Sequence, residues 1–136
     1  MPGRRYGRGV AAVAVLAAVG ACGSLPERRD AVTLQVTRFE RLLAAGRYAP
    51  LCGTLAPATR EELEHTAEAA CARAIGEEEL PPGGAVRQVD VYGAQARVVL
   101  EHDTVFLSHF PDGWKVTAAG CLPRPERPYQ CAIEGG

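Results

Sequence analysis

Cysteines are the residues of this 136-residue chain whose number and spacing constrain its chemistry most. The chain has 5 cysteines. An even number of them follow the N-terminal segment: Cys52, Cys71, Cys121 and Cys131. Structural zinc sites commonly space two ligands as C-x-x-C, and no such pair occurs here. In an exported domain, an even set of cysteines without metal spacing predicts disulfides.

Four cysteines allow three pairings, and the sequence-local pairing closes the shortest loops. We predict this one, which joins Cys52 to Cys71 and Cys121 to Cys131. In the chain-entropy model, loops of these sizes stabilise a fold by roughly 2–3 kcal/mol each. The first bond would fix the loop that enters a helix. The second would hold a proline-rich tail, LPRPERPYQ, against the edge of a sheet, because its prolines are not expected to extend a strand ladder regularly.

The remaining cysteine, Cys22, lies in a different context. Three arginines precede an apolar segment from Val10 to Val19, which falls short of the roughly 20 residues that span a bilayer. The letters VGAC follow at 19–22, and this order resembles a bacterial lipoprotein signal. The resemblance implies that cleavage leaves Cys22 as the first residue, acylated through its sulfur at the extracytoplasmic face of the cell membrane. The alternatives are an ordinary secretory signal and an uncleaved anchor helix.

The expected organisation is therefore a signal peptide at residues 1–21, a lipidated tether at 22–29 and one domain at 30–136 with a disulfide-tied tail. Removing the signal's three arginines lowers the basic residues from 15 to 12 against 16 acidic ones, a net charge of −4. A mildly acidic domain lacks the basic surface that nucleic acids require, so we expect no nucleic-acid partner.

Apolar residues occupy every second position over much of the stretch from Val86 to Cys121, the period of strands with one buried face. Turn residues interrupt it at Tyr92-Gly93, at His102-Asp103 and at Pro111-Asp112-Gly113. The pattern predicts an antiparallel meander of about four strands joined by tight turns.

The segment before the meander carries helical patterns. Asp30 is a candidate N-cap for a helix over about Ala31–Ala45, with its apolar residues on one face. An irregular connection at 47–56 then leads to a second helix, which Pro57 opens and a Thr59–Glu62 capping box supports. Its apolar stripe is Leu63, Ala67, Ala70 and Ala74, and Cys71 lies within it. Helices followed by an antiparallel sheet predict an α+β fold.

This order resembles the nuclear transport factor 2-like superfamily, a cone in which N-terminal helices pack on a curved antiparallel sheet. The resemblance rests on the long helix around Val32–Leu43, on GAQARV at 93–98 and on DGWKV at 112–116. The chain is similar to small actinobacterial-type lipoproteins of this superfamily, whose function is unassigned. The superfamily includes isomerases, dehydratases, binding modules and transport factors, so the fold does not fix the function. Many members of the superfamily form homodimers through the open face of the sheet, so the resemblance includes a homodimer among the expected states of this chain.

In isomerase-type members, carboxylates or histidines project into the cone. The candidate pocket residues implied here are Asp90, Tyr92, His109 and Trp114. His109 shares its strand parity with buried positions, so it would serve either as a proton-transfer group or as a cap of the pocket. Other polar residues are expected to be solvated: Glu101, His102 and Asp103 at a turn, His65, and the acidic run at 77–79.

Two classes of function remain. The first is a non-catalytic membrane lipoprotein that binds a small ligand or a membrane-protein partner. The alternative is a small acid–base enzyme, isomerase- or dehydratase-like, that uses a polar residue in the cone. The sequence contains no Ser-His-Asp ordering, glycine-rich phosphate loop or paired zinc motif. This favours the first class, with no assigned catalytic residue, metal or cofactor.

Overall fold

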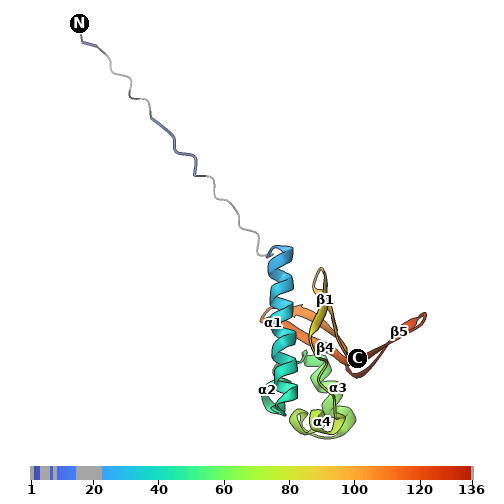
Figure 1. Cartoon of the computed structure of the whole chain (residues 1–136). Coiled ribbons are helices and arrows are strands. Elements are labelled where there is room, and N and C mark those ends of the chain that lie inside the picture. Colours follow the sequence, from blue (N-terminus) through green and yellow to red (C-terminus); the bar gives the residue numbers. More distant parts are fainter. Residues whose placement is uncertain (1, 4–6, 8, 15–22, 136) are drawn as a thin grey trace.

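The computed structural model describes residues 2–3, 7, 9–14 and 23–135, and in this part the chain has an α+β fold (Figure 1). The helices are α1 (Leu25–Ala44), α2 (Tyr48–Cys52), α3 (Pro57–Ala67) and α4 (Cys71–Glu78). The strands are β1 (Val86–Tyr92), β2 (Gln95–Leu100), β3 (Thr104–Phe110), β4 (Gly113–Arg124) and β5 (Arg127–Glu134). They form one five-stranded antiparallel sheet in the order β1-β2-β3-β4-β5.

Helix α1 lies across one face of this sheet and supplies much of the core. Its buried residues follow helical spacing: Val32, Val36, Phe39, Leu42 and Leu43. They meet the buried residues of the central strands, among them Val98, Leu107 and Val116, which are fully buried. Both sets lie at the positions that the apolar patterns indicate.

Helix α1 begins at Leu25, earlier than the expected start at Ala31. Ser24 is the N-cap, and it forms a capping box in which its hydroxyl accepts from the Glu27 amide while the Glu27 carboxylate accepts from the Ser24 amide. Pro26 fits the first turn, where no intrahelical N–H is needed. Most of the expected tether at 22–29 is therefore helical rather than flexible.

The predicted second helix is two helices, and its predicted N-cap is wrong. The chain leaves α3 at Glu68, which has a left-handed φ of 49°, and Cys71 opens α4 rather than lying inside one helix. Ala56 is the N-cap of α3, without a side-chain hydrogen bond. Thr59 instead donates from its hydroxyl to the Thr117 carbonyl at 2.9 Å, which fastens α3 to β4. The expected irregular connection contains the short helix α2.

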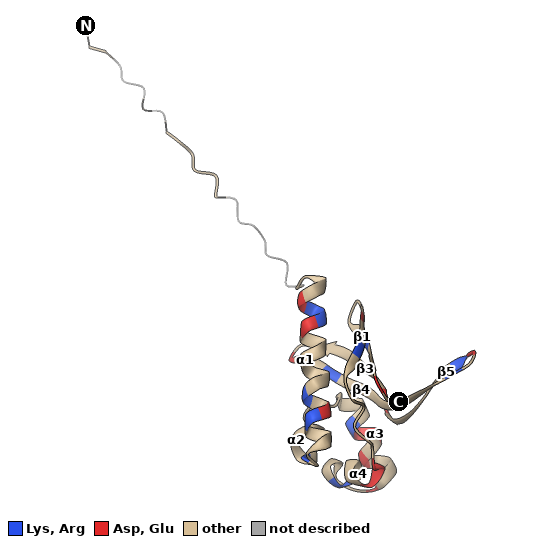
Figure 2. Cartoon of the chain, viewed as in Figure 1, with Lys and Arg blue, Asp and Glu red and all other residues tan. Residues whose placement is uncertain are grey.

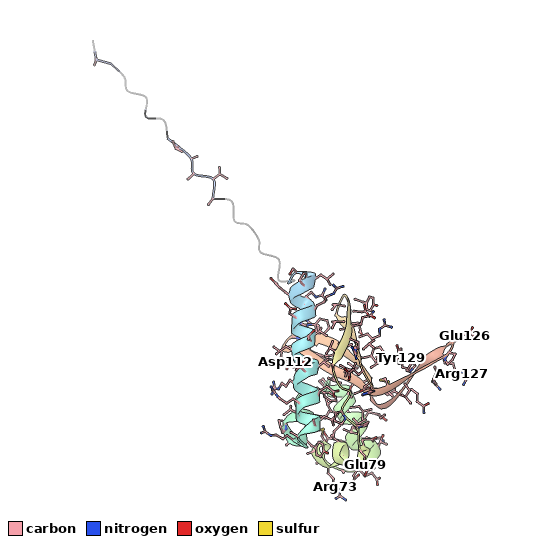
Figure 3. All side chains as sticks on the ribbon, viewed as in Figure 1. Arg73, Glu79, Asp112, Glu126, Arg127 and Tyr129 are labelled. Atoms are coloured by element: carbon pink, nitrogen blue, oxygen red, sulfur yellow. A yellow bond between two sulfur atoms is a disulfide. The ribbon has the colours of Figure 1, made fainter. Side chains whose placement is uncertain are left out.

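The C-terminal tail is also more regular than its prolines suggest, since β5 pairs with β4 along its length. Pro123 falls where the register between the two strands shifts, and Pro125 lies in the turn. Pro128 is on β5, an edge strand with only one neighbour, where a missing N–H can face solvent. The hairpin projects from the body, with Glu126 and Arg127 near its tip and Tyr129 close to the sheet (Figure 3).

The described residues contain two disulfides, which join the partners of the sequence-local pairing. Cys52–Cys71 links the end of α2 to the start of α4, and both residues are buried. Cys121–Cys131 links directly opposite residues of β4 and β5. The first bond therefore holds the helical layer together, and the second closes the base of the projecting hairpin.

Candidate functional site

Asp90 and Tyr92 lie on the face of the sheet opposite α1. Asp90 is the cross-strand neighbour of Arg97. Its carboxylate accepts from the Arg97 guanidinium at 2.8 Å and from the side-chain amide of Gln88 at 2.9 Å. The Arg97 hydrogen bond, and then that of Gln88, hold the pKa of Asp90 below its usual value. Asp90 is thus an ion-paired carboxylate. Tyr92 is exposed beside the β1–β2 turn.

His109 and Trp114 lie on the other face, beside α1. They are cross-strand neighbours in the β3–β4 hairpin, with ring centroids 5.1 Å apart in an edge-to-face arrangement. Trp114 is buried and His109 is exposed. The Arg28 guanidinium of α1 lies 5.8 Å from the centre of the indole ring, within the range of a cation–π contact.

These three side chains line a cleft of about 330 Å³ between α1 and the β3–β4 hairpin, which we call the α1–hairpin cleft. Its remaining lining residues are Gly23, Glu27, Ala31, Leu34, Gln35 and Gly113. The sheet thus places His109 on the α1 face, as its parity with Val105 and Leu107 predicts, and beside Trp114, whereas Asp90 and Tyr92 lie on the opposite face. Sequence reasoning missed Arg28, because it falls in the segment expected to be a tether.

Arg28 is the cation of the cleft. It is half-buried, and within the described part of the chain no carboxylate forms an ion pair with it. Glu27, the other charged lining residue, is engaged in the capping box with Ser24. Elsewhere on α1, basic and acidic residues alternate along the helix rather than forming a run of one sign (Figure 2).

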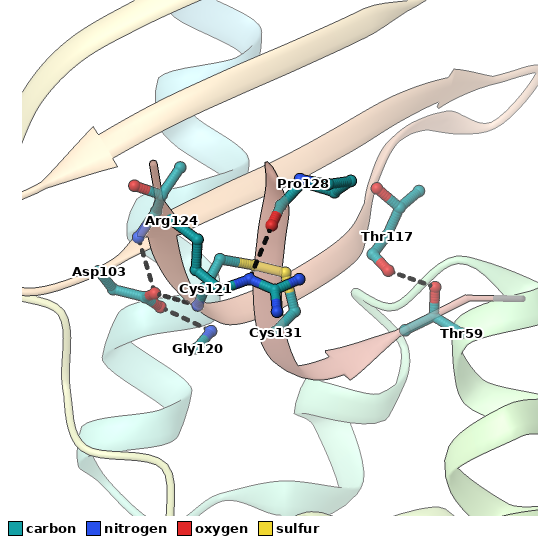
Figure 4. Close-up of a disulfide and its surroundings, with 9 residues drawn as sticks. Thr59, Asp103, Thr117, Gly120, Cys121, Arg124, Pro128 and Cys131 are labelled. Carbon is teal, nitrogen blue, oxygen red and sulfur yellow. Dashed lines mark hydrogen bonds between the residues drawn. A yellow bond between two sulfur atoms is a disulfide. The ribbon is translucent and has the colours of Figure 1, made fainter. Parts of the chain in front are cut away.

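Asp103 is a structural anchor, and its expected role as a solvated turn residue is wrong. Its Oδ1 accepts from the Thr104 amide at 2.7 Å and the Cys121 amide at 2.8 Å. Its Oδ2 accepts from the Gly120 amide at 3.0 Å (Figure 4). One carboxylate therefore ties the start of β3 to β4, next to the Cys121–Cys131 disulfide. The neighbouring Glu101 and His102 are exposed, as expected.

Glu40 of α1 is a second partly buried carboxylate at this end of the sheet. Its Oε2 accepts from the Gly83 amide at 2.7 Å, while its Oε1 is buried without a hydrogen-bond partner. Burial raises the pKa of Glu40, and the charge of Asp103 adds to the rise against the lowering effect of the Gly83 bond.

We expect Glu40→Gln to be more stable than the wild type at pH 7. Because the folded state holds the Glu40 proton more tightly, wild-type stability falls as pH rises above the ordinary value of 4.5 through the raised pKa. The glutamine side chain keeps an oxygen that accepts from the Gly83 N–H, but it does not titrate, so its contribution to stability does not change with pH. Urea unfolding between pH 4 and 7 measures the free energy of unfolding of both proteins, with exposed Glu61→Gln as the control. A Glu40→Gln variant that is less stable than the wild type at pH 7 would contradict the raised pKa of Glu40.

Two other cavities lie away from these residues. One of about 400 Å³ opens on the surface of α3 beside Ala58, Glu61, Glu62 and His65. The other, about 170 Å³, lies between α3 and β5. Over residues 23–135 and the described N-terminal positions, no group of three or more His, Cys, Asp and Glu side chains is arranged to hold a metal ion. The same described positions contain no helix of the length and apolarity needed to cross a membrane.

Cys22 lies outside the described residues, so the geometry of the expected lipidation site is not part of the structure. The cleft begins one residue later, at Gly23. No protein-family model matches the chain, and neither a curated protein nor a solved structure shows significant similarity to it.

Proposed function

We propose that the protein is a lipoprotein, anchored through Cys22 at the extracytoplasmic face of the cell membrane, whose domain binds a small ligand without catalysis. The observation that carries the proposal is the α1–hairpin cleft, which contains Arg28, His109 and Trp114 and starts at Gly23. Its volume of about 330 Å³ is within the range of small-molecule sites, about 300–1,000 Å³.

The arrangement of the polar candidates supports a binding role over an acid–base enzyme. His109 lies on the α1 face, while Asp90 lies on the opposite face and pairs with Arg97. General acid–base catalysis needs the two groups to reach one substrate, at about 2.6–3.2 Å from the atoms that exchange protons. A sheet between them prevents this.

The compartment and the fold are supported by separate observations. Disulfides persist in oxidising compartments, which agrees with export. A long α1 across an antiparallel sheet is what the nuclear transport factor 2-like resemblance implies, and we propose that family of folds for this domain.

Cys22→Ser tests the anchor. Serine has no thiol to acylate, so we expect the variant to leave the membrane fraction, either released into the medium or retained as an unprocessed precursor. Cell fractionation with immunoblotting measures this, and Gly3→Ser, outside the VGAC motif, is the matched control that should stay with the membrane. Normal processing and unchanged membrane retention of Cys22→Ser would contradict the proposed anchor.

A further inference from the structure

We propose that the α1–hairpin cleft binds a fatty acid, with its carboxylate at Arg28 and its chain along Ala31, Leu34 and Trp114. This inference rests on the proposed function, because it names the ligand of the same cleft. Four observations support it: the apolar wall, the volume, the charge and the place of the cleft in the chain.

The wall of the cleft includes an exposed apolar side chain on α1. Leu34 is 73% exposed although it lines the cleft, and the indole of Trp114, which is only 7% exposed, forms the opposite side. An alkyl chain between them would remove the apolar surface of Leu34 from water, which is favourable, and would contact the exposed edge of the indole. A volume of about 330 Å³ is near the lower end for ligand sites, so it accommodates one chain rather than a two-chain lipid.

Arg28 supplies the charge for a carboxylate head group. Its guanidinium lies over the indole and forms no ion pair within the described residues, so its donors remain available. Guanidinium and carboxylate form paired, charge-assisted hydrogen bonds. Glu27 also lines the cleft, and its negative charge opposes a dianionic phosphate more than a singly charged carboxylate.

The position of the cleft next to the proposed lipid anchor favours an amphiphile from the membrane as its ligand. Gly23 lines the cleft and directly follows Cys22, so a lipid on Cys22 would hold the opening near the membrane surface. Fatty acids are concentrated there. The protein's own acyl groups are the competing occupants, and the experiment must separate them from a free fatty acid.

Trp114 is the only tryptophan in the chain and lies in the cleft, so its fluorescence reports on occupancy. The full-length Cys22→Ser chain, which lacks acyl groups, is titrated with bromododecanoate, because bromine quenches indole at short range. The uncharged probe is bromododecanol, and both are used below the concentrations at which they form micelles. We expect saturable quenching by both probes, with tighter binding of the carboxylate.

Arg28→Gln should weaken carboxylate binding about tenfold or more, as expected for loss of a charge-assisted hydrogen bond, and leave alcohol binding nearly unchanged. Arg38→Gln, on the exposed face of the same helix, is the matched control and should change neither. Leu34→Asp should weaken both probes; because Leu34 is exposed in the wild type, the domain should still fold, which circular dichroism verifies.

The proposal is overturned if the wild-type cleft shows no saturable quenching, or if Arg28→Gln affects the two probes equally. Displacement of bromododecanoate at lower concentrations of dodecyl phosphate than of dodecanoate would also overturn it. So would quenching that occurs in the Cys22→Ser chain but not in the acylated protein, because the protein's own lipid would then be the occupant. Unchanged membrane retention of Cys22→Ser would count against the lipid anchor. The titration tests separately whether the α1–hairpin cleft binds a fatty acid, because it uses the chain without acyl groups.

Discussion

Replacing both Cys52 and Cys71 with alanine should lower the free energy of unfolding by about 3 kcal/mol, the chain-entropy value for a loop of this length. The two residues are 19 positions apart, so their bond restrains the unfolded chain substantially. It also joins α2 to α4 in the folded state. Alanine is preferable to serine at these sites, because both cysteines are buried and a serine hydroxyl would lose its hydrogen bonds to water.

Urea or guanidinium unfolding under oxidising conditions measures this loss, with the Cys121→Ala/Cys131→Ala pair for comparison. That pair should lose less stability, because it closes a loop of only 10 positions and the β4–β5 ladder still holds the two strands together. An unchanged unfolding midpoint for the Cys52→Ala/Cys71→Ala variant would contradict this role of the bond.

Asp103→Asn should destabilise the domain by about 3 kcal/mol, as expected when charge-assisted hydrogen bonds are lost and a largely buried N–H donor is left unpaired. The carboxylate accepts from three backbone amides, through both of its oxygens. Asparagine retains one acceptor oxygen, but its NH₂ group would face either the Gly120 amide or the amides of Thr104 and Cys121. Two donors then oppose each other beside the base of the β4–β5 hairpin.

The matched control is Asp112→Asn, the same chemical change at the β3–β4 turn. Asp112 is exposed and makes only an i,i+3 ion pair with Lys115, so its replacement should leave the free energy of unfolding nearly unchanged. Denaturant unfolding of the two variants side by side gives the comparison. Equal effects of the two substitutions would show that Asp103 is not the anchor described above.

Periodicity predicted the core well, because burial depends mainly on which face a residue occupies. The alternation in β2–β4 and the spacing of Val32, Val36 and Phe39 indicate the buried positions that the structure shows. The same rule applies to the site. His109 shares the parity of Val105 and Leu107, whereas Asp90 has the opposite parity to Val89 and Val91, and this already separates the two candidates.

The features that the sequence did not predict depend on specific backbone geometry or on contacts between distant segments. Ser24 and Glu27 do carry a capping-box pattern, but Asp30 offered a competing helix start, so the early residues of α1, including Arg28, were missed. The left-handed Glu68 that separates α3 from α4 has no local signal of the kind that glycine provides. Asp103 bonds to amides 17 and 18 residues away, which no local pattern reveals.

The most direct test of the proposed lipoprotein is the mass of the N-terminal peptide of the protein isolated from membranes. We predict that this peptide begins at Cys22 and carries the additional mass of a diacylglyceryl group, which lipase treatment or alkaline hydrolysis reduces. A peptide that begins at another residue, or one in which Cys22 has an unmodified thiol, would contradict the proposed lipid anchor.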